Sequence, residues 1–166
     1  YGLITYREVA LMVDDDVASA STKQRVAIVI AHELAHQWFG NLTTMAWWNS
    51  LWLNEGFAAF MEHFGTDALY PEYCIWEQYT IGAYRHAQML DGMRSSHPVI
   101  VPIKDAKEVE QVFDAISYCK GSTVVRMVNA ITGAEAFRKG LQTYFAKYSY
   151  GNALSLIHIS EPTRPS

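Results

Sequence analysis

The residues His32-Glu33-Leu34-Ala35-His36 form an HExxH motif. Positions four apart lie on one face of a helix, so both imidazoles can reach one metal ion at about 2.0 to 2.1 Å from each nitrogen. Glu33, beside the first histidine, can lean over the open coordination position and hold a water as a general base. By composition alone such a motif arises in about one chain in a hundred of this length, so a further ligand must support it.

Glu55 meets that requirement. A catalytic zinc site takes three protein ligands and leaves one position for water. Glu55 follows His36 after 18 intervening residues, at the start of a second expected helix. Two antiparallel helices joined by a short connection would bring it opposite the histidine pair. We therefore expect His32, His36 and Glu55 to bind one Zn²⁺ per chain, the alternative being a buried polar cluster without metal.

The surrounding sequence predicts a mainly helical domain, α+β overall, with a short strand region at its start. The strand-like run is Leu3-Ile4-Thr5-Tyr6, and Val99 to Ile103 is expected to be extended. Ser21 or Thr22 is placed to cap the first helix, and Asp114 the fourth. Apolar periodicity and breaker residues indicate five helices, over residues 23–39, 54–69, 72–89, 115–131 and 134–146.

Four motifs in order resemble the zinc aminopeptidases of the puromycin-sensitive and alanyl aminopeptidase type. They are YGLITYRE at residues 1–8, HELAHQWFGN at 32–41, LWLNEGFA at 51–58 and AISYCKG at 115–121. The likeness implies a partial thermolysin-like zinc peptidase catalytic domain over residues 1–154. It implies a peptide substrate with a free N-terminus.

The same resemblance assigns roles to individual residues. It makes His32, His36 and Glu55 the zinc ligands and Glu33 the residue that activates water. Tyr118, in the AISYCKG motif, would donate a hydrogen bond to the oxyanion of the tetrahedral intermediate. A phenol donor about 3 Å from developing negative charge is chemically suited to that role.

The chain also departs from the family pattern. In the family a G-A-M-E-N loop, whose acidic residue binds the substrate α-amino group, comes directly before the segment that matches Tyr1, so we expect this loop to be missing from this sequence. Residues 155–166, SLIHISEPTRPS, read as a non-native tail. We therefore expect a fragment of a larger enzyme, inactive when isolated. A thermolysin-like endopeptidase, the epoxide-hydrolysing branch of the superfamily and an inactive zinc-binding fragment stay open as alternatives.

Other polar and aromatic residues are weaker candidates. Glu62 lies on nearly the same helix face as Glu55 and would either orient a zinc-ligating histidine or be a solvated charge. Lys120 would either lower the pKa of Tyr118 or be a surface lysine. The remaining expectations are structural. The histidines without a partner at ligand spacing are expected to be structural or exposed: His63, His86 and His97. Trp47 and Trp52 are expected to pack under the zinc site, and Cys74 and Cys119 to be reduced thiols in the core.

Composition excludes several classes of protein. Half of the residues are apolar and 18% are charged, so the chain is built to bury a core and is not disordered. The net charge is −4 with no basic block, which argues against nucleic-acid binding. No apolar run approaches the roughly 20 residues of a membrane span. The low number of cysteines and the lack of any N-x-[ST] sequon other than Asn41-Leu42-Thr43, which overlaps a recognised motif, favour the cytoplasm. A membrane-anchored ectoenzyme and the oligomeric state stay open.

Overall fold

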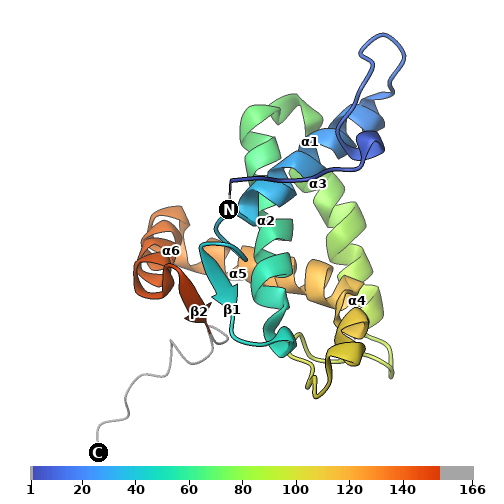
Figure 1. Ribbon diagram of the computed structural model, residues 1–166. Coiled ribbons are helices and arrows are strands. Elements are labelled where there is room, and N and C mark those ends of the chain that lie inside the picture. Colours follow the sequence, from blue (N-terminus) through green and yellow to red (C-terminus); the bar gives the residue numbers. More distant parts are fainter. Residues whose placement is uncertain (1, 154–166) are drawn as a thin grey trace, which may run out of the picture.

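The computed structural model describes residues 2–153, which are mostly helical (Figure 1). The α-helices are α1 (Ala20–Ala35), α2 (Trp52–Leu69), α3 (Ile75–Tyr79), α4 (Arg85–Asp91), α5 (Gly121–Thr132) and α6 (Ala134–Tyr148). The strands are β1 (Thr43–Met45) and β2 (Gly151–Ala153). Two π-helical turns, η4 (Thr80–Tyr84) and η6 (Ile116–Lys120), precede α4 and α5. Short 3₁₀ turns are η1 (Glu8–Ala10), η2 (Trp48–Ser50), η3 (Pro71–Tyr73) and η5 (Ala106–Val112).

Helix α1 begins and ends earlier than its apolar pattern predicts. Ser19, and not Ser21 or Thr22, is the N-cap, because its hydroxyl accepts a hydrogen bond from the Thr22 backbone N–H at 3.2 Å. At the other end, the N–H of Trp38 bonds the carbonyl three residues back. The helix tightens into turns after Ala35, as helix ends commonly do.

The core lies where α2 packs between α1 and α5. Phe57, Ala58 and Phe60 of α2 are 4% exposed or less and pack with Phe39 after α1 and Val125 of α5. The apolar face predicted for this helix is therefore confirmed in its central part. Figure 1 shows α2 running through the middle of the molecule with α5 crossing behind it.

Two glycines let the backbones of α2 and α5 touch. A Cβ added at Gly56 would lie 3.0 Å from the Cα and carbonyl carbon of Gly121, and one at Gly121 would lie 3.1 Å from the Gly56 Cα. Backbone atoms cannot move aside as the end of a side chain can. Neither position therefore has room for a larger residue.

The sheet joins distant parts of the chain. β1 and β2 pair in parallel, with Thr43 opposite Gly151 and Met45 opposite Ala153. Thr43 is buried, and its hydroxyl donates to the Tyr148 carbonyl at 3.3 Å. The segment that follows the HExxH helix is thereby fixed to the end of α6.

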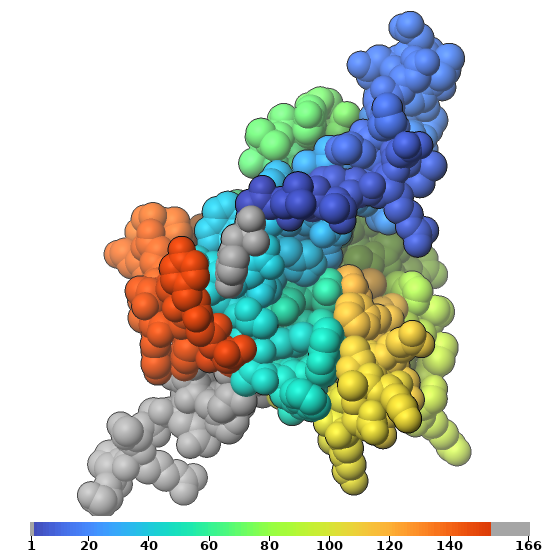
Figure 2. Space-filling view, in the orientation of Figure 1, coloured from blue at the N-terminus to red at the C-terminus, as the bar shows by residue number. Residues whose placement is uncertain are grey.

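The prediction of a strand at the start of the chain is wrong. Within residues 2–153 the sheet has only β1 and β2, so Leu3 to Tyr6 have no strand beside them. They run extended across the surface of α1 (Figure 2), and the Gly2 N–H donates to the Gln37 side chain at 3.4 Å. The strand-like residue types do not suffice without a partner.

Other expectations are met with shifted boundaries. Asp114 caps the helical segment after it, since its carboxylate accepts the Ser117 N–H at 2.9 Å. That segment opens with the π turn η6, and the helix expected over residues 72–89 is interrupted by the π turn η4. No helix within residues 2–153 is long and apolar enough to cross a bilayer. The proposed tail at 155–166 lies outside the described residues.

Replacement of Gly56 by alanine should destabilise the chain by about 1 to 3 kcal/mol, because the added methyl group would push α2 and α5 apart. Chemical denaturation followed by circular dichroism measures the effect. Gly65→Ala is the matched control on the same helix: its Cβ would meet nothing nearer than Ala31 at 3.9 Å. That variant should be neutral or up to about 1 kcal/mol more stable. Equal effects of the two variants would contradict the contact.

Candidate metal centre

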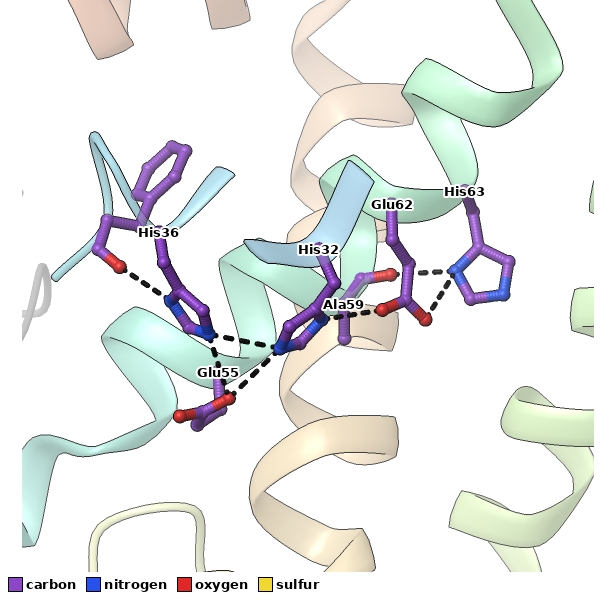
Figure 3. A network of polar contacts seen from close by, with 7 residues as sticks. His32, His36, Glu55, Ala59, Glu62 and His63 are labelled. Atoms are coloured by element: carbon purple, nitrogen blue, oxygen red, sulfur yellow. Dashed lines mark hydrogen bonds and ion pairs between the residues drawn. The ribbon is translucent and has the colours of Figure 1, made fainter. Parts of the chain in front are cut away.

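Three predicted ligands meet where the last turn of α1 faces the first turn of α2 (Figure 3). The Nε2 atoms of His32 and His36 are 3.0 Å apart. Each lies 3.3 Å from the same Glu55 oxygen, Oε2. All three side chains are largely buried, with at most 21% of each exposed.

This geometry fits a zinc ion. Zinc–ligand bonds of about 2.0 to 2.1 Å at tetrahedral angles separate neighbouring ligand atoms by about 3.4 Å. The three atoms form a triangle close to that size, and the chemistry of two imidazoles and one carboxylate is that of a catalytic zinc site. Among residues 2–153 this is the cluster of histidine, cysteine and carboxylate groups that could hold a metal.

The second nitrogen of each histidine ring is also bonded. Nδ1 of His32 contacts Oε2 of Glu62 at 2.6 Å, and Nδ1 of His36 contacts the Phe39 carbonyl at 3.0 Å. A carboxylate and a carbonyl only accept, so both Nδ1 atoms donate and both Nε2 atoms are left to bind metal. Glu62 is therefore the orienting carboxylate and not a solvated charge. Its seven-residue spacing from Glu55 was the signal in the sequence.

Charge compensation inside the cluster shifts the pKa values of His32, His36 and Glu55. Burial lowers the pKa of His32, but hydrogen bonds to Glu55 and Glu62 outweigh it and raise the pKa to about 9. Burial would raise the pKa of Glu55, yet hydrogen bonds from His32 and His36 lower it to about 2. Without metal, the histidines and the carboxylates therefore stabilise each other as ions.

Tyr118 and Glu33 border the ligands. The Tyr118 ring stacks on His32 with centroids 6.1 Å apart and an interplanar angle of 14°. Burial raises the pKa of Tyr118, and the charge of Glu55 raises it further. The negative charge of the half-buried Glu33 also raises the pKa of Tyr118 and the pKa of Tyr6. The phenol therefore stays protonated beside the site.

The predictions for the weaker candidates have different outcomes. Lys120 forms an ion pair with Asp91 at 2.6 Å, and since the pKa of Tyr118 is raised, it does not make the phenol more acidic. Trp52 is 5% exposed, as expected of a core residue. Trp47 is 46% exposed, so its assignment to the core is wrong: its indole N–H donates to the Ile103 carbonyl at 2.8 Å.

The remaining histidines differ from one another. His63 lies 3.3 Å from Glu62 and bonds the Ala59 carbonyl, at the outer end of the ligand network. His86 is exposed on α4. His97 forms an ion pair with Asp114, a contact that the sequence spacing of the histidines did not predict. Both cysteines are free thiols; Cys119 is half-buried, but Cys74 is exposed, so its assignment to the core is wrong.

A groove opens beside the metal cluster, with a volume of about 480 Å³. Its position was not predicted from the sequence, because it depends on how β1 and the turn η2 lie against the start of α2. It is bordered by two ligands, by β1 and by aromatic side chains, among them His36, Glu55, Thr44, Trp47, Trp48 and Phe113.

Comparison with protein families agrees with this geometry. The model of the peptidase family M1 domain matches residues 1–157. The chain belongs to peptidase family M1. The family implies zinc, and the His32, His36 and Glu55 cluster is its candidate site in this chain.

Individual M1 relatives carry aminopeptidase names. The chain is 54% identical to Aminopeptidase M1-C of Oryza sativa subsp. japonica over 153 residues. It is 52% identical to Aminopeptidase M1 of Arabidopsis thaliana, and 52% identical to Aminopeptidase 2, mitochondrial, of Saccharomyces cerevisiae. Each match covers 92% of this chain but only 16% to 17% of the relative. The chain thus spans about one sixth of the length of these proteins.

Zinc should bind at about one ion per chain and be lost in Glu55→Ala, because that change removes one of three ligands. Glu62→Gln should retain zinc with an affinity reduced about 10- to 100-fold, since the ligands remain but the orienting carboxylate is gone. Elemental analysis and competition with a chromophoric chelator measure both. Glu72→Gln, an exposed change near the end of α2, is the control. Equal zinc affinity in the Glu62 and Glu72 variants would refute the role of Glu62.

In the metal-free chain, stability should fall as the pH rises from 6.5 to 9.5. The pKa of His32 is raised from 6.5 to about 9 in the folded chain, so its stabilisation is complete below pH 6.5 and lost as the pH rises through 9. The lowered pKa of Glu55 contributes stability that is complete above pH 4.5 and is lost only as the pH falls towards 2, so it does not vary between pH 6.5 and 9.5. Urea unfolding of chelator-treated chain tests this, and His32→Gln should flatten the dependence. A wild-type midpoint independent of pH in this range would contradict it.

Proposed function

We propose that the protein carrying this chain is a zinc aminopeptidase that hydrolyses the N-terminal peptide bond of peptides. The observation that carries the proposal is the convergence of three ligand atoms, 3.0 to 3.3 Å apart. The Nδ1 atom of each histidine is bonded to an acceptor, which orients the ring. Membership of family M1 and the names of the relatives support the exopeptidase class.

Zinc, when bound, would polarise the scissile carbonyl and make a water more acidic. Glu33 follows a ligand directly along α1, and its carboxylate would take the proton of the attacking water and pass it to the leaving amine. Tyr118 would donate a hydrogen bond to the developing oxyanion. Its raised pKa supports this role, because the hydroxyl keeps its proton at neutral pH.

The groove beside the cluster supports a peptide substrate. It borders both His36 and Glu55, so a chain lying in it would pass the metal. Its wall of Trp47, Trp48 and Phe113 offers apolar surface to side chains of the substrate. We propose the cytoplasm as the compartment, which the two free thiols support.

Glu33→Gln and Tyr118→Phe in the full-length protein should lower kcat on an aminoacyl-arylamide about 10²- to 10⁴-fold and 10²- to 10³-fold, respectively. Both should keep zinc, because neither residue is among the ligands. Tyr84→Phe, which alters a hydroxyl on the exposed face of η4, is the matched control and should leave kcat unchanged.

The class of peptidase is decided by the same assay with N-acetylated substrates. An aminopeptidase needs the free α-amino group and should cleave the acetylated substrates at a rate near zero. Equal cleavage of both would replace the proposal with a thermolysin-like endopeptidase. Zinc binding without cleavage of either substrate would leave a metal-binding protein with no peptidase activity.

A further inference from the structure

His97 and Asp114 form a short ion pair between the loop after α4 and the start of η6. His97 Nε2 lies 2.5 Å from Asp114 Oδ2, and its Nδ1 lies 2.8 Å from the Pro98 carbonyl. Both partners can only accept, so both ring nitrogens donate and the imidazole is positively charged. The pKa of His97 is raised accordingly, by the Pro98 carbonyl first and by Asp114 against the effect of burial.

Asp114 also holds the turn that carries Tyr118. Its other carboxylate oxygen, Oδ1, accepts the Ser117 N–H at 2.9 Å. Its backbone carbonyl accepts the Tyr118 N–H at 3.2 Å. Ser117 is 1% exposed, so this end of η6 is packed against its surroundings, while the side chains of His97 and Asp114 are each 31% exposed. Asp114 therefore ties the His97 loop to the backbone of η6: its carboxylate bonds Ser117 and its backbone carbonyl bonds Tyr118.

A second contact fixes the same turn from the other end. Lys120 pairs with Asp91 at 2.6 Å, and Asp91 also accepts from the Ser96 hydroxyl at 2.8 Å. Ser96 directly precedes His97, so the loop is anchored to both ends of η6. Gly121, the next residue, is pressed against Gly56, beside the ligand Glu55.

The π turn makes this support necessary. A π turn departs from the regular hydrogen-bond ladder of an α-helix; it occurs mostly as a single turn within a helix, frequently at a functional site. The Tyr118 ring must keep its place on His32, with centroids 6.1 Å apart, for its hydroxyl to reach the site. Small displacements of a catalytic group are costly, about 10²-fold in rate for 1 Å.

We propose that His97 and Asp114 are positioning residues, whose ion pair fixes the π turn η6 so that the Tyr118 hydroxyl faces the metal site. The proposal rests on the proposed function for its effect on catalysis, but the placement of Tyr118 can be measured without any substrate.

The first experiment follows the Tyr118 ring by NMR in the zinc-loaded 166-residue chain. Ring-¹³C labelling reports on all ten tyrosines, and Tyr118→Phe identifies the Tyr118 signal. His97→Ala should shift or broaden that signal while zinc content stays at the wild-type value. His97→Gln, whose amide can still donate to Asp114, should restore most of it. His86→Ala, at an exposed histidine of α4, is the matched control and should leave the signal unchanged.

An unchanged Tyr118 signal in His97→Ala would overturn the proposal. Loss of zinc together with the signal would also overturn it, because the pair would then support the fold as a whole. Asp114→Asn provides a second variant: its amide keeps an acceptor for the Ser117 N–H but loses the charge, so a smaller shift is expected.

The second experiment measures kinetics on an aminoacyl-arylamide in the full-length protein. His97→Ala should lower kcat about 10- to 100-fold with KM nearly unchanged, and His97→Gln should recover most of the loss. A change in KM alone would contradict positioning of Tyr118. An inactive wild-type protein would refute the proposed function but not the positioning, which the NMR signal decides independently.

Discussion

The site depends on the contact between the backbones of Gly56 and Gly121. Gly56 is the neighbour of the ligand Glu55, and Gly121 follows the turn that bears Tyr118. Direct backbone contact brings α2 and α5 closer than side chains would permit. A ligand and a candidate oxyanion donor, 63 positions apart in the sequence (118 − 55), thus meet at one place because neither glycine carries a Cβ.

Close to that contact, the negative charges of Glu55 and Glu62 are offset by the histidine between them. Glu55 and Glu62 flank His32 from opposite sides of its ring, at 3.3 and 2.6 Å. Two carboxylates so close together in a half-buried site would repel each other without an intervening cation. The histidine supplies it when no metal is present, and a bound metal would supply it otherwise.

The residues of the site were predictable from the sequence, but their placement only in part. His32, His36 and Glu55 follow from spacing, because a helical turn fixes i and i+4 on one face. Tyr118 came from family resemblance alone, since nothing distinguishes it among ten tyrosines. The π turns, the exposure of Trp47 and the His97–Asp114 pair depend on tertiary contacts that periodicity does not encode. Likewise Leu3 to Tyr6 had strand-like residues but no strand to join in the part of the chain that the structure describes.

The parallel pairing of β1 with β2 determines when the segment after the HExxH helix can find its partner during synthesis. Thr43 begins the first strand after the HExxH helix, yet its hydroxyl donates to the Tyr148 carbonyl and it pairs with Gly151, more than a hundred residues later. A ribosome making about 5 to 20 residues per second needs several seconds to cover that distance. For that time the loop after the metal-binding helix lacks its partner, so β1 can pair only once α6 and β2 have been made.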